Sequence, residues 1–285
     1  DTWFWNETSE KYYNELVNKA SVNLAKTIIG LRGFLDENDL MAYLVNMAIR
    51  LKELHRVLKT SGSLYLHCDW SAGHYLKILL DAIFGEENFK NEIIWHYSVG
   101  GRSSRYFPRK HDTIFFYTKG KDWTFNKNAI SVPRKTGYES FGGRIIEENG
   151  KKYQIKVTKG GKEYKYRLDK GKTPEDVWVD IQSIQSQSKE RLSYPTQKPE
   201  TLLERIILAS SKKDYWILHS VMGCGTTIVA AEKLKRKWIG IDITYLAVNL
   251  IKYRIFDSFG KLNYEVIGEP KDLHGAINLA KQDKY

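Results

Sequence analysis

The chain has 285 residues and a formal net charge of +11, from 45 Lys and Arg against 34 Asp and Glu. Hydrophobic residues make up 42%, as in ordinary globular proteins, and no run approaches the roughly 18 apolar residues of a membrane span. The two cysteines, Cys68 and Cys224, form no CxxC pair, which excludes a disulfide scaffold and a zinc site and favours a reducing, cytoplasmic setting. No other metal-ligand spacing occurs. Because the first residue is Asp1 and not Met, we expect that the start of the chain has been removed.

The positive charge favours a polyanionic partner, of which nucleic acid is the commonest. Basic residues alternate with aromatic ones in two segments, a combination that suits phosphate neutralisation and base stacking. The first is a loop with Arg102, Arg105, Arg109 and Lys110 around Tyr106 and Phe107, and the second spans residues 151–167. A basic surface without a specific partner is the alternative explanation.

Helices and strands alternate in the first third of the chain. Asp39 is a predicted N-cap, and apolar residues then recur at three- and four-residue steps as far as Leu58. Residues 63–69 are a predicted buried strand. Ser71 is expected to cap the next helix, which ends at Gly85.

Two further strands, at 92–97 and 112–118, flank a glycine-containing loop. From about residue 123 to 176 helical periodicity is replaced by alternation. Asn149-Gly150 is a strong hairpin signal, and Gly160-Gly161 predicts a second turn. We interpret this region as a small β-rich insertion.

The α/β pattern resumes at Pro199, which suits the first turn of a helix. A strand at 215–218 leads into glycines at 223 and 225, then a helix at 226–234 and a strand at 237–243 that contains Asp242. The glycines permit a tight bend with close ligand approach, and the following helix presents free N–H groups.

Asp242 lies about 17 residues beyond the second glycine, close to the spacing at which an acid binds ribose hydroxyls. Capping of the next helix is the alternative role for this acid. The bend has only GxG, and no phosphate-binding lysine follows, which disfavours both a nicotinamide oxidoreductase and a P-loop nucleotidase. Adenosine without a pyrophosphate, as in S-adenosylmethionine (SAM), fits better.

The segment Tyr194-Pro-Thr-Gln-Lys-Pro-Glu200, followed by its helix, the glycine bend and Trp238-Ile-Gly-Ile-Asp-Ile243, resembles a known enzyme family. These are the SAM-dependent amino-group DNA methyltransferases, specific for N6 of adenine or N4 of cytosine, in the permuted order called beta. The resemblance extends through most of the chain, including residues 54–69, 81–89 and 111–114.

This resemblance implies an α/β fold with a doubly wound, mostly parallel Rossmann-like sheet and a β-rich target-recognition insertion. The implied domains are a catalytic half at 1–122 whose start is missing, the insertion at 123–188, a SAM-binding half at 189–263 and a C-terminal extension at 264–285. In that extension we expect a short strand and a helix.

The resemblance also implies site residues. Thr196 and Lys198 would lie near the methionine carboxylate, and Asp242 would hold the ribose. The full cofactor set is Thr196, Lys198, Met222, Gly223, Gly225, Thr226 and Asp242, and the expected DNA contacts are Arg102, Arg105, Arg109 and Lys110.

Two departures from the family pattern bear on activity. The family's catalytic Asp/Asn/Ser-Pro-Pro-aromatic motif is absent, because no Pro-Pro pair occurs in these residues, so no catalytic residue is assigned. At the bend, His219 replaces an acid that helps to hold the cofactor's amino group, and Val221 replaces a phenylalanine. Because an imidazole beside a cation loses attraction and adds repulsion if protonated, we expect weakened or absent SAM binding.

The sequence therefore supports a site-specific DNA methyltransferase that transfers a methyl group from SAM to an exocyclic amino group in double-stranded DNA. A catalytically inactive methyltransferase-like module that binds DNA or a partner enzyme is the alternative, favoured by the altered bend. A homodimer and a larger restriction or defence complex are both open as the assembly.

Overall fold

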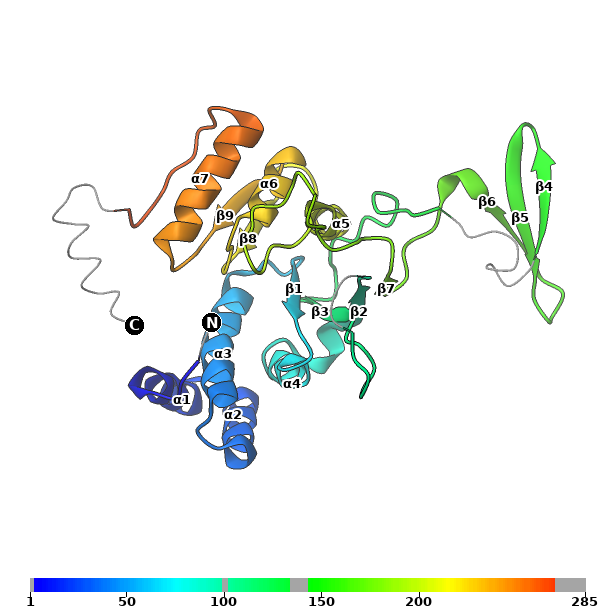
Figure 1. Cartoon of the computed structure of the whole chain (residues 1–285). Coiled ribbons are helices and arrows are strands. Elements are labelled where there is room, and N and C mark those ends of the chain that lie inside the picture. The colour runs from blue at the N-terminus through cyan, green and yellow to red at the C-terminus, as the bar shows by residue number, and fades with distance from the viewer. Residues whose placement is uncertain (1–2, 99–101, 134–142, 270–285) are drawn as a thin grey trace.

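The structure, a computed structural model, describes residues 3–98, 102–133 and 143–269 (Figure 1). The helices are α1 (Glu7–Lys19), α2 (Val22–Leu35), α3 (Asp39–Val57), α4 (Gly73–Phe84), α5 (Glu200–Ser210), α6 (Thr226–Lys233) and α7 (Tyr245–Phe259). The strands are β1 (Ser63–Cys68), β2 (Phe89–His96), β3 (His111–Thr118), β4 (Arg144–Glu148), β5 (Lys151–Val157), β6 (Glu163–Arg167), β7 (Val177–Trp178), β8 (Trp216–His219) and β9 (Lys237–Gly240).

Two predicted helix caps in the first third of the chain are wrong. The side chain of Asn38, not of Asp39, caps α3 by accepting a hydrogen bond of 2.9 Å from the Met41 backbone N–H. Ser71 does not cap α4, because its N–H and hydroxyl both donate to the Asp69 carboxylate and the helix begins two residues later. Gly85 ends α4 as predicted, with a φ of +86°.

The strands form one four-stranded sheet, in the order β1-β3-β2-β7, and a separate parallel pair, β8-β9. β1 and β2 both run antiparallel to β3, and β7 runs parallel to β2, so the strand directions are mixed where a mostly parallel sheet was expected. The reason lies in the connection from β2 to β3, which forms no helix in its described residues 97–98 and 102–110 and returns the chain antiparallel. β9 ends at Gly240, three residues before its predicted end.

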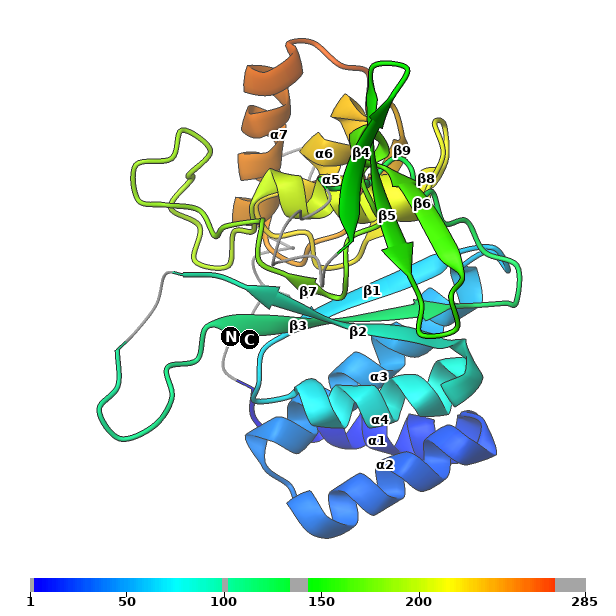
Figure 2. The ribbon, with the colours of Figure 1, turned by 90° about the vertical axis from the view of Figure 1, so that its right-hand side faces the viewer.

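Alternate side chains of β3 point to opposite faces of the four-stranded sheet. Phe115 and Tyr117 pack into a core with α1, α2, α3 and α4. Ile114 and Phe116 pack on the opposite face with Trp178 and with Leu202 of α5. Because side chains of a strand alternate in direction, the buried residues 114–118 of β3 contact a helical layer on one face of the sheet and a second helical layer on the other (Figure 2).

α5 connects the four-stranded sheet to the β8-β9 pair. Its Leu202 and Leu203 contact the sheet core, while Leu203 and Ile207 contact Ala230 of α6 and Ile217 of β8. A further core beneath α7 contains Ile228 and Ile251. Pro199 is the N-cap residue of this helix and so stands just before the first turn, in which it was predicted to lie.

The β-rich insertion forms an arm that projects from the rest of the molecule (Figure 1). β4 and β5 pair antiparallel across Asn149 and Gly150, whose φ angles of +53° and +68° are those of a tight hairpin turn, as predicted. β6 pairs with β5 after the turn that contains Gly161. The predicted domain boundaries around this arm, 123 and 188, stay predictions.

In the C-terminal extension, residues 264–269 form neither helix nor strand, and the rest of the predicted strand and helix lies outside the described residues. In the part of the chain that the structure describes, no helix is both long and apolar enough to cross a membrane.

The core around α3 predicts a large cost for Leu44→Ala, because Leu44 is fully buried in the helical core. We expect a loss of about 2–5 kcal/mol in the free energy of unfolding, from the lost burial and the remaining cavity. Leu246→Ala on α7, where Leu246 is 75% exposed, is the matched control and should cost less than about 0.5 kcal/mol. Urea denaturation of both variants measures the difference, and equal losses would contradict this packing.

Candidate cofactor-binding site

The bend between β8 and α6 requires glycine at two positions. Gly223 and Gly225 have φ angles of +52° and +74°, which side chains disfavour. A Cβ on Gly225 would lie 2.6 Å from Ile251 of α7, and one on Gly223 would lie 3.1 Å from the Tyr194 ring. The chain therefore passes close to both neighbours. Tyr194, which begins the Tyr194–Glu200 segment but was given no site role, lies directly against the bend.

Asp242 holds this bend and the start of α7 together. One carboxylate oxygen accepts a hydrogen bond of 2.8 Å from the Gly223 backbone N–H, and the other accepts from the backbone and hydroxyl of Thr244. Thr244, not Asp242, is the N-cap of α7. A carboxylate offers about four acceptor positions, so three are used and one is left for a ligand hydroxyl.

Arg254 is a buried charge that ties α7 to the bend. It is 8% exposed, and its guanidinium donates to the Cys224 carbonyl at 3.0 Å and to the Thr226 hydroxyl at 2.9 Å. The first of these hydrogen bonds satisfies the Cys224 carbonyl of the bend, and the second fixes the first residue of α6. An arginine in the middle of an amphipathic helix gives no signal of such burial, so sequence reasoning missed it.

The predicted cofactor residues of the bend differ in where their side chains lie. Thr226 is buried beneath Arg254, and Met222 packs into the core with Ile228, its sulfur filling the space above Gly240. Because the side chains of Met222 and Thr226 pack against the protein, these two residues can offer a ligand only their backbone groups. Gly223 and Gly225 shape the bend itself.

Lys198 enters the site from the loop before α5. Its ammonium lies 3.9 Å from a carboxylate oxygen of Asp112 on β3 and is half-buried. Burial lowers the pKa of Lys198, while the charges of Asp112 and Asp69 and the nearby Cys224 oppose this. Cys224 belongs to the glycine bend, so Lys198 lies between that bend and the four-stranded sheet. Thr196, two residues earlier, is exposed.

His219 ends β8 with its ring buried. Its Nδ1 atom has no hydrogen-bond partner among the described residues. Burial lowers the pKa of His219, and the charge of Asp242 opposes the effect only in part. The imidazole is therefore uncharged near neutral pH, so the repulsion of a protonated ring does not arise, although the attraction of a carboxylate is still missing.

The residues expected to contact DNA lie on the loop between β2 and β3, which extends beyond the sheet in Figure 2. Arg102 and Arg105 are exposed. The guanidinium of Arg109 lies 3.6 Å from the centroid of the Trp70 ring, and Lys110 donates to the Ser98 carbonyl. Arg109 is thus fixed against the end of β1, near Asp69, on the same side as Lys198.

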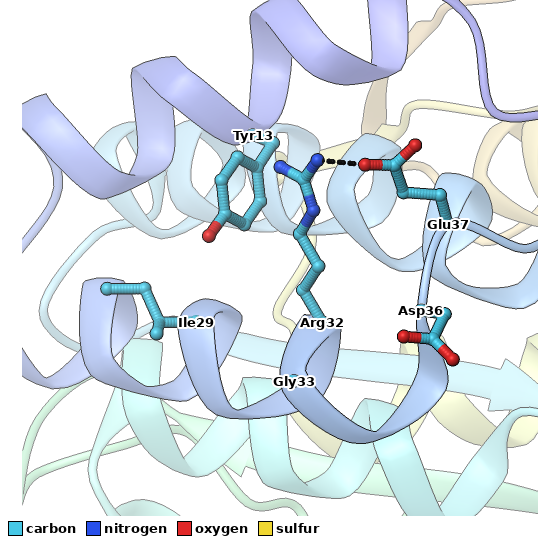
Figure 3. Close-up of a pocket in the computed structure, with 6 residues that line it drawn as sticks. All are labelled: Tyr13, Ile29, Arg32, Gly33, Asp36 and Glu37. Carbon is cyan, nitrogen blue, oxygen red and sulfur yellow. Dashed lines mark hydrogen bonds and ion pairs between the residues drawn. The ribbon is translucent and has the colours of Figure 1, made fainter.

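A hollow of about 520 Å³ between α1 and α2 is a second concave feature, far from the glycine bend (Figures 1 and 3). Arg32 dominates it, but ion pairs with Glu10 and Glu37 and the Tyr13 ring at 4.2 Å already satisfy its charge. The Arg32 cation that lines this hollow is therefore already paired with carboxylates of the protein itself. Across residues 3–98, 102–133 and 143–269, no group of three or more His, Cys, Asp or Glu side chains could hold a metal ion.

A family model described as DNA methylase matches residues 13–252, which includes the glycine bend, Lys198 and the four-stranded sheet. The chain belongs to this DNA methylase family. The resemblance recognised in the sequence is thereby confirmed.

Curated relatives are type II methyltransferases and an adenine methyltransferase. The chain is 31% identical to M.HpaI of Haemophilus parainfluenzae over 80% of its length and 65% of that enzyme's. It is 29% identical to M.BglII of Bacillus subtilis, over 88% of the chain and 64% of that enzyme. It is 32% identical to the DNA adenine methyltransferase YhdJ of Escherichia coli, over 68% of the chain and 60% of that enzyme. This DNA methylase chain thus spans less than two thirds of each of these relatives.

Solved structures confirm the predicted Rossmann-like α/β fold class of the methylase. The cytosine-N4-specific PvuII DNA methyltransferase superposes with a TM-score of 0.54 at 14% identity, over 86% of this chain and 77% of that one. TTHA0409 of Thermus thermophilus, solved in complex with S-adenosyl-L-methionine, gives a TM-score of 0.51 at 16% identity, over 79% of this chain and 81% of that one.

The burial of His219 predicts that its ring titrates below the ordinary value of 6.5. As the pH falls below 6.5, the unfolded chain takes up a proton that the folded ring resists, so the free energy of unfolding declines. Proton NMR titration, with the signal assigned by His219→Gln, measures the midpoint. Asp242→Asn should lower it further, because Asp242 favours the protonated ring. A midpoint at or above 6.5 would contradict this account.

Proposed function

We propose that this chain is the SAM-binding and DNA-contacting part of a site-specific DNA methyltransferase that acts on the exocyclic amino group of adenine or cytosine. The observation that carries the proposal is the Gly223–Gly225 bend, held by the Asp242 carboxylate and lying beside the half-buried Lys198 ammonium. An acceptor for hydroxyls and a cation for a carboxylate, placed on either side of one bend, match a ligand that joins a ribose to an amino acid.

SAM, when bound, supplies an electrophilic methyl group on its sulfonium. The residues proposed to hold it are Thr196, Lys198, Met222, Gly223, Gly225, Thr226 and Asp242. Of these, Asp242 would accept from a ribose hydroxyl through its remaining acceptor position, and Lys198 would pair with the methionine carboxylate. Met222 and Thr226 would contribute through their backbone, since their side chains are directed into the protein.

The chemistry at the base is not assigned to any residue of this chain. Transfer of a methyl group to an amino nitrogen needs groups that accept the hydrogen bonds of that amino group while the base is out of the helix. In the family such groups belong to a Pro-Pro motif, and no Pro-Pro pair occurs among the 285 residues. This chain would therefore bind and orient the cofactor and the DNA.

Double-stranded DNA is the proposed partner of the loop residues Arg102, Arg105, Arg109 and Lys110 and of the projecting arm. Lysines of the arm lie over its tyrosines, with the Lys165 ammonium 4.4 Å from the Tyr153 ring centroid. Tyr164 and Tyr166 stack at 6.3 Å. Cations carried on aromatic surfaces can contact phosphates and bases together, so we propose the 123–188 insertion as the part that reads the target sequence.

The relatives named above are all described as methyltransferases, so they give no support to an inactive module. The expected assembly, a homodimer or a larger restriction or defence complex, stays a prediction. Transfer of a labelled methyl group from SAM to duplex DNA by the full-length protein is the direct test of the function.

Asp242→Asn should weaken the binding of S-adenosylhomocysteine by about 10- to 100-fold, because hydrogen bonds to a charged acceptor are worth about 1.5–3 kcal/mol. Isothermal titration calorimetry measures the dissociation constant, and thermal unfolding checks that the bend is intact. Asp257→Asn, which removes an exposed carboxylate of α7, is the matched control and should bind like the wild type. Equal affinity of both variants would contradict the proposed ribose contact.

Removal of two loop charges, in Arg102→Gln/Arg105→Gln, should weaken the binding of duplex DNA. The slope of log K against log salt should fall by about 1 for each phosphate that the variant no longer neutralises. Fluorescence anisotropy at several salt concentrations measures both quantities. Lys212→Gln/Lys213→Gln removes the same charge from an exposed site after α5. If the affinity of the two double variants falls equally, the loop does not bind DNA specifically.

A further inference from the structure

Four polar side chains from four separate segments meet beside the glycine bend. The Asp112 carboxylate on β3 is hydrogen-bonded by His67 of β1 at 2.9 Å and by Tyr97, just after β2, at 3.0 Å. Lys198, from the loop before α5, is the fourth, at 3.9 Å. The side chain of Asp112 is only 15% exposed.

The strand register explains why these side chains meet. β3 lies between β1 and β2, with Trp95 of β2 directly opposite Asp112 and with His67 of β1 opposite Ile114, two residues along. Diagonal neighbours on one face of a sheet lie within reach of each other's side chains. Asp112 is therefore held from both sides by the sheet, and its position does not depend on Lys198.

Lys198 does depend on Asp112. Its ammonium forms no other ion pair within residues 3–98, 102–133 and 143–269, and at 3.9 Å it makes no direct hydrogen bond to that carboxylate. The ammonium thus keeps donors for a ligand, while the fixed carboxylate sets its direction. An ammonium that loses part of its hydration on burial is stabilised by a partner of opposite charge.

We propose that Asp112, fixed by His67 and Tyr97, is a positioning residue that keeps Lys198 protonated and directed towards the glycine bend for the carboxylate of an amino-acid-bearing nucleoside. This inference rests on the proposed function and adds the four-stranded sheet to the ligand site. The sheet thereby fixes the cation that meets the ligand, although Asp112 does not touch the ligand itself.

The charges around Lys198 determine the pH at which its ammonium loses a proton. Burial lowers the pKa of Lys198, and three groups face it and oppose that effect: Asp112 on β3, Asp69 after β1 and Cys224 in the bend. Without the charge of Asp112, Lys198 would lose its proton at a lower pH. Tyr97 does not interfere, because burial and Asp112 raise its pKa to about 12.

The experiment measures the dissociation constant of S-adenosylhomocysteine by calorimetry from pH 7 to pH 10. We expect Asp112→Asn to bind about tenfold more weakly at pH 7 and to lose binding at a lower pH than the wild type. Asp112→Glu keeps the charge and should retain the wild-type profile. Asp122→Asn, at an exposed position, is the matched control for loss of a carboxylate. Repeating the series with Cys224→Ser removes the thiol that also faces Lys198.

A second ligand separates positioning from general damage. 5′-Methylthioadenosine has the adenosine part but no carboxylate, so wild type and Asp112→Asn should bind it equally at every pH. The guanidinium of Lys198→Arg stays protonated at alkaline pH. This variant should therefore lose affinity for S-adenosylhomocysteine only as far as titration of the ligand's own amino group requires. If Asp112 only stabilised the fold, its substitution would not shift the pH at which binding of S-adenosylhomocysteine is lost while leaving the affinity for 5′-methylthioadenosine unchanged.

Two outcomes overturn different statements. If the wild-type protein binds neither nucleoside, the proposed function fails. If the wild type binds both, but the pH profile of Asp112→Asn coincides with it, or the affinity for 5′-methylthioadenosine falls equally, the positioning role of Asp112 is wrong and the proposed function stands. If Asp112→Asn does not fold, Lys198→Arg provides the test. The positioning role of Asp112 is wrong if Lys198→Arg and the wild type lose affinity for S-adenosylhomocysteine equally at alkaline pH.

Discussion

The packing of α5 between two separate groups of strands is the constraint on which the site depends. Leu203 contacts both the four-stranded sheet core and the core beneath α6, so one helix aligns β1, β2 and β3 with β8 and β9. The loop that precedes this helix carries Lys198. Because apolar burial fixes α5 against both cores, the ammonium at its start is brought between Asp112 on one side and the glycine bend on the other.

Charge in this molecule is used in two ways. On the arm and the β2–β3 loop, cations are exposed and lie over aromatic rings, where water and salt screen them and their effect on stability is small. Around the bend, Lys198, Asp112, Asp242, His219 and Arg254 are partly or fully buried, so each depends on specific partners. The first arrangement suits a long polyanion, and the second suits one small ligand in a fixed orientation.

Much of the fold could be predicted because its signals are local. The hairpin at Asn149-Gly150 and the glycine bend before α6 follow from backbone preferences that neighbouring residues cannot override. The cap at Asp39 was wrong because two adjacent polar residues could each cap, and only the path of the chain chooses between Asn38 and Asp39. The cap at Ser71 was wrong because Ser71 bonds the Asp69 side chain, and α4 begins after Ala72 without a side-chain cap. The strand directions were not visible either, since alternation of side chains is the same in parallel and antiparallel strands.

The sequence by itself determined the family and the position of the glycine bend, because each is written in contiguous motifs whose spacing survives without a fold. Only the tertiary structure decided that Asp112, far from Lys198 in the sequence, stands beside it, and that Arg254 is buried under the bend. Burial, which lowers the pKa of His219, is likewise a property of the folded chain. These features depend on distance and burial in three dimensions. A linear pattern carries neither, because the energy of a charge is set by what surrounds it and not by its neighbours in the chain.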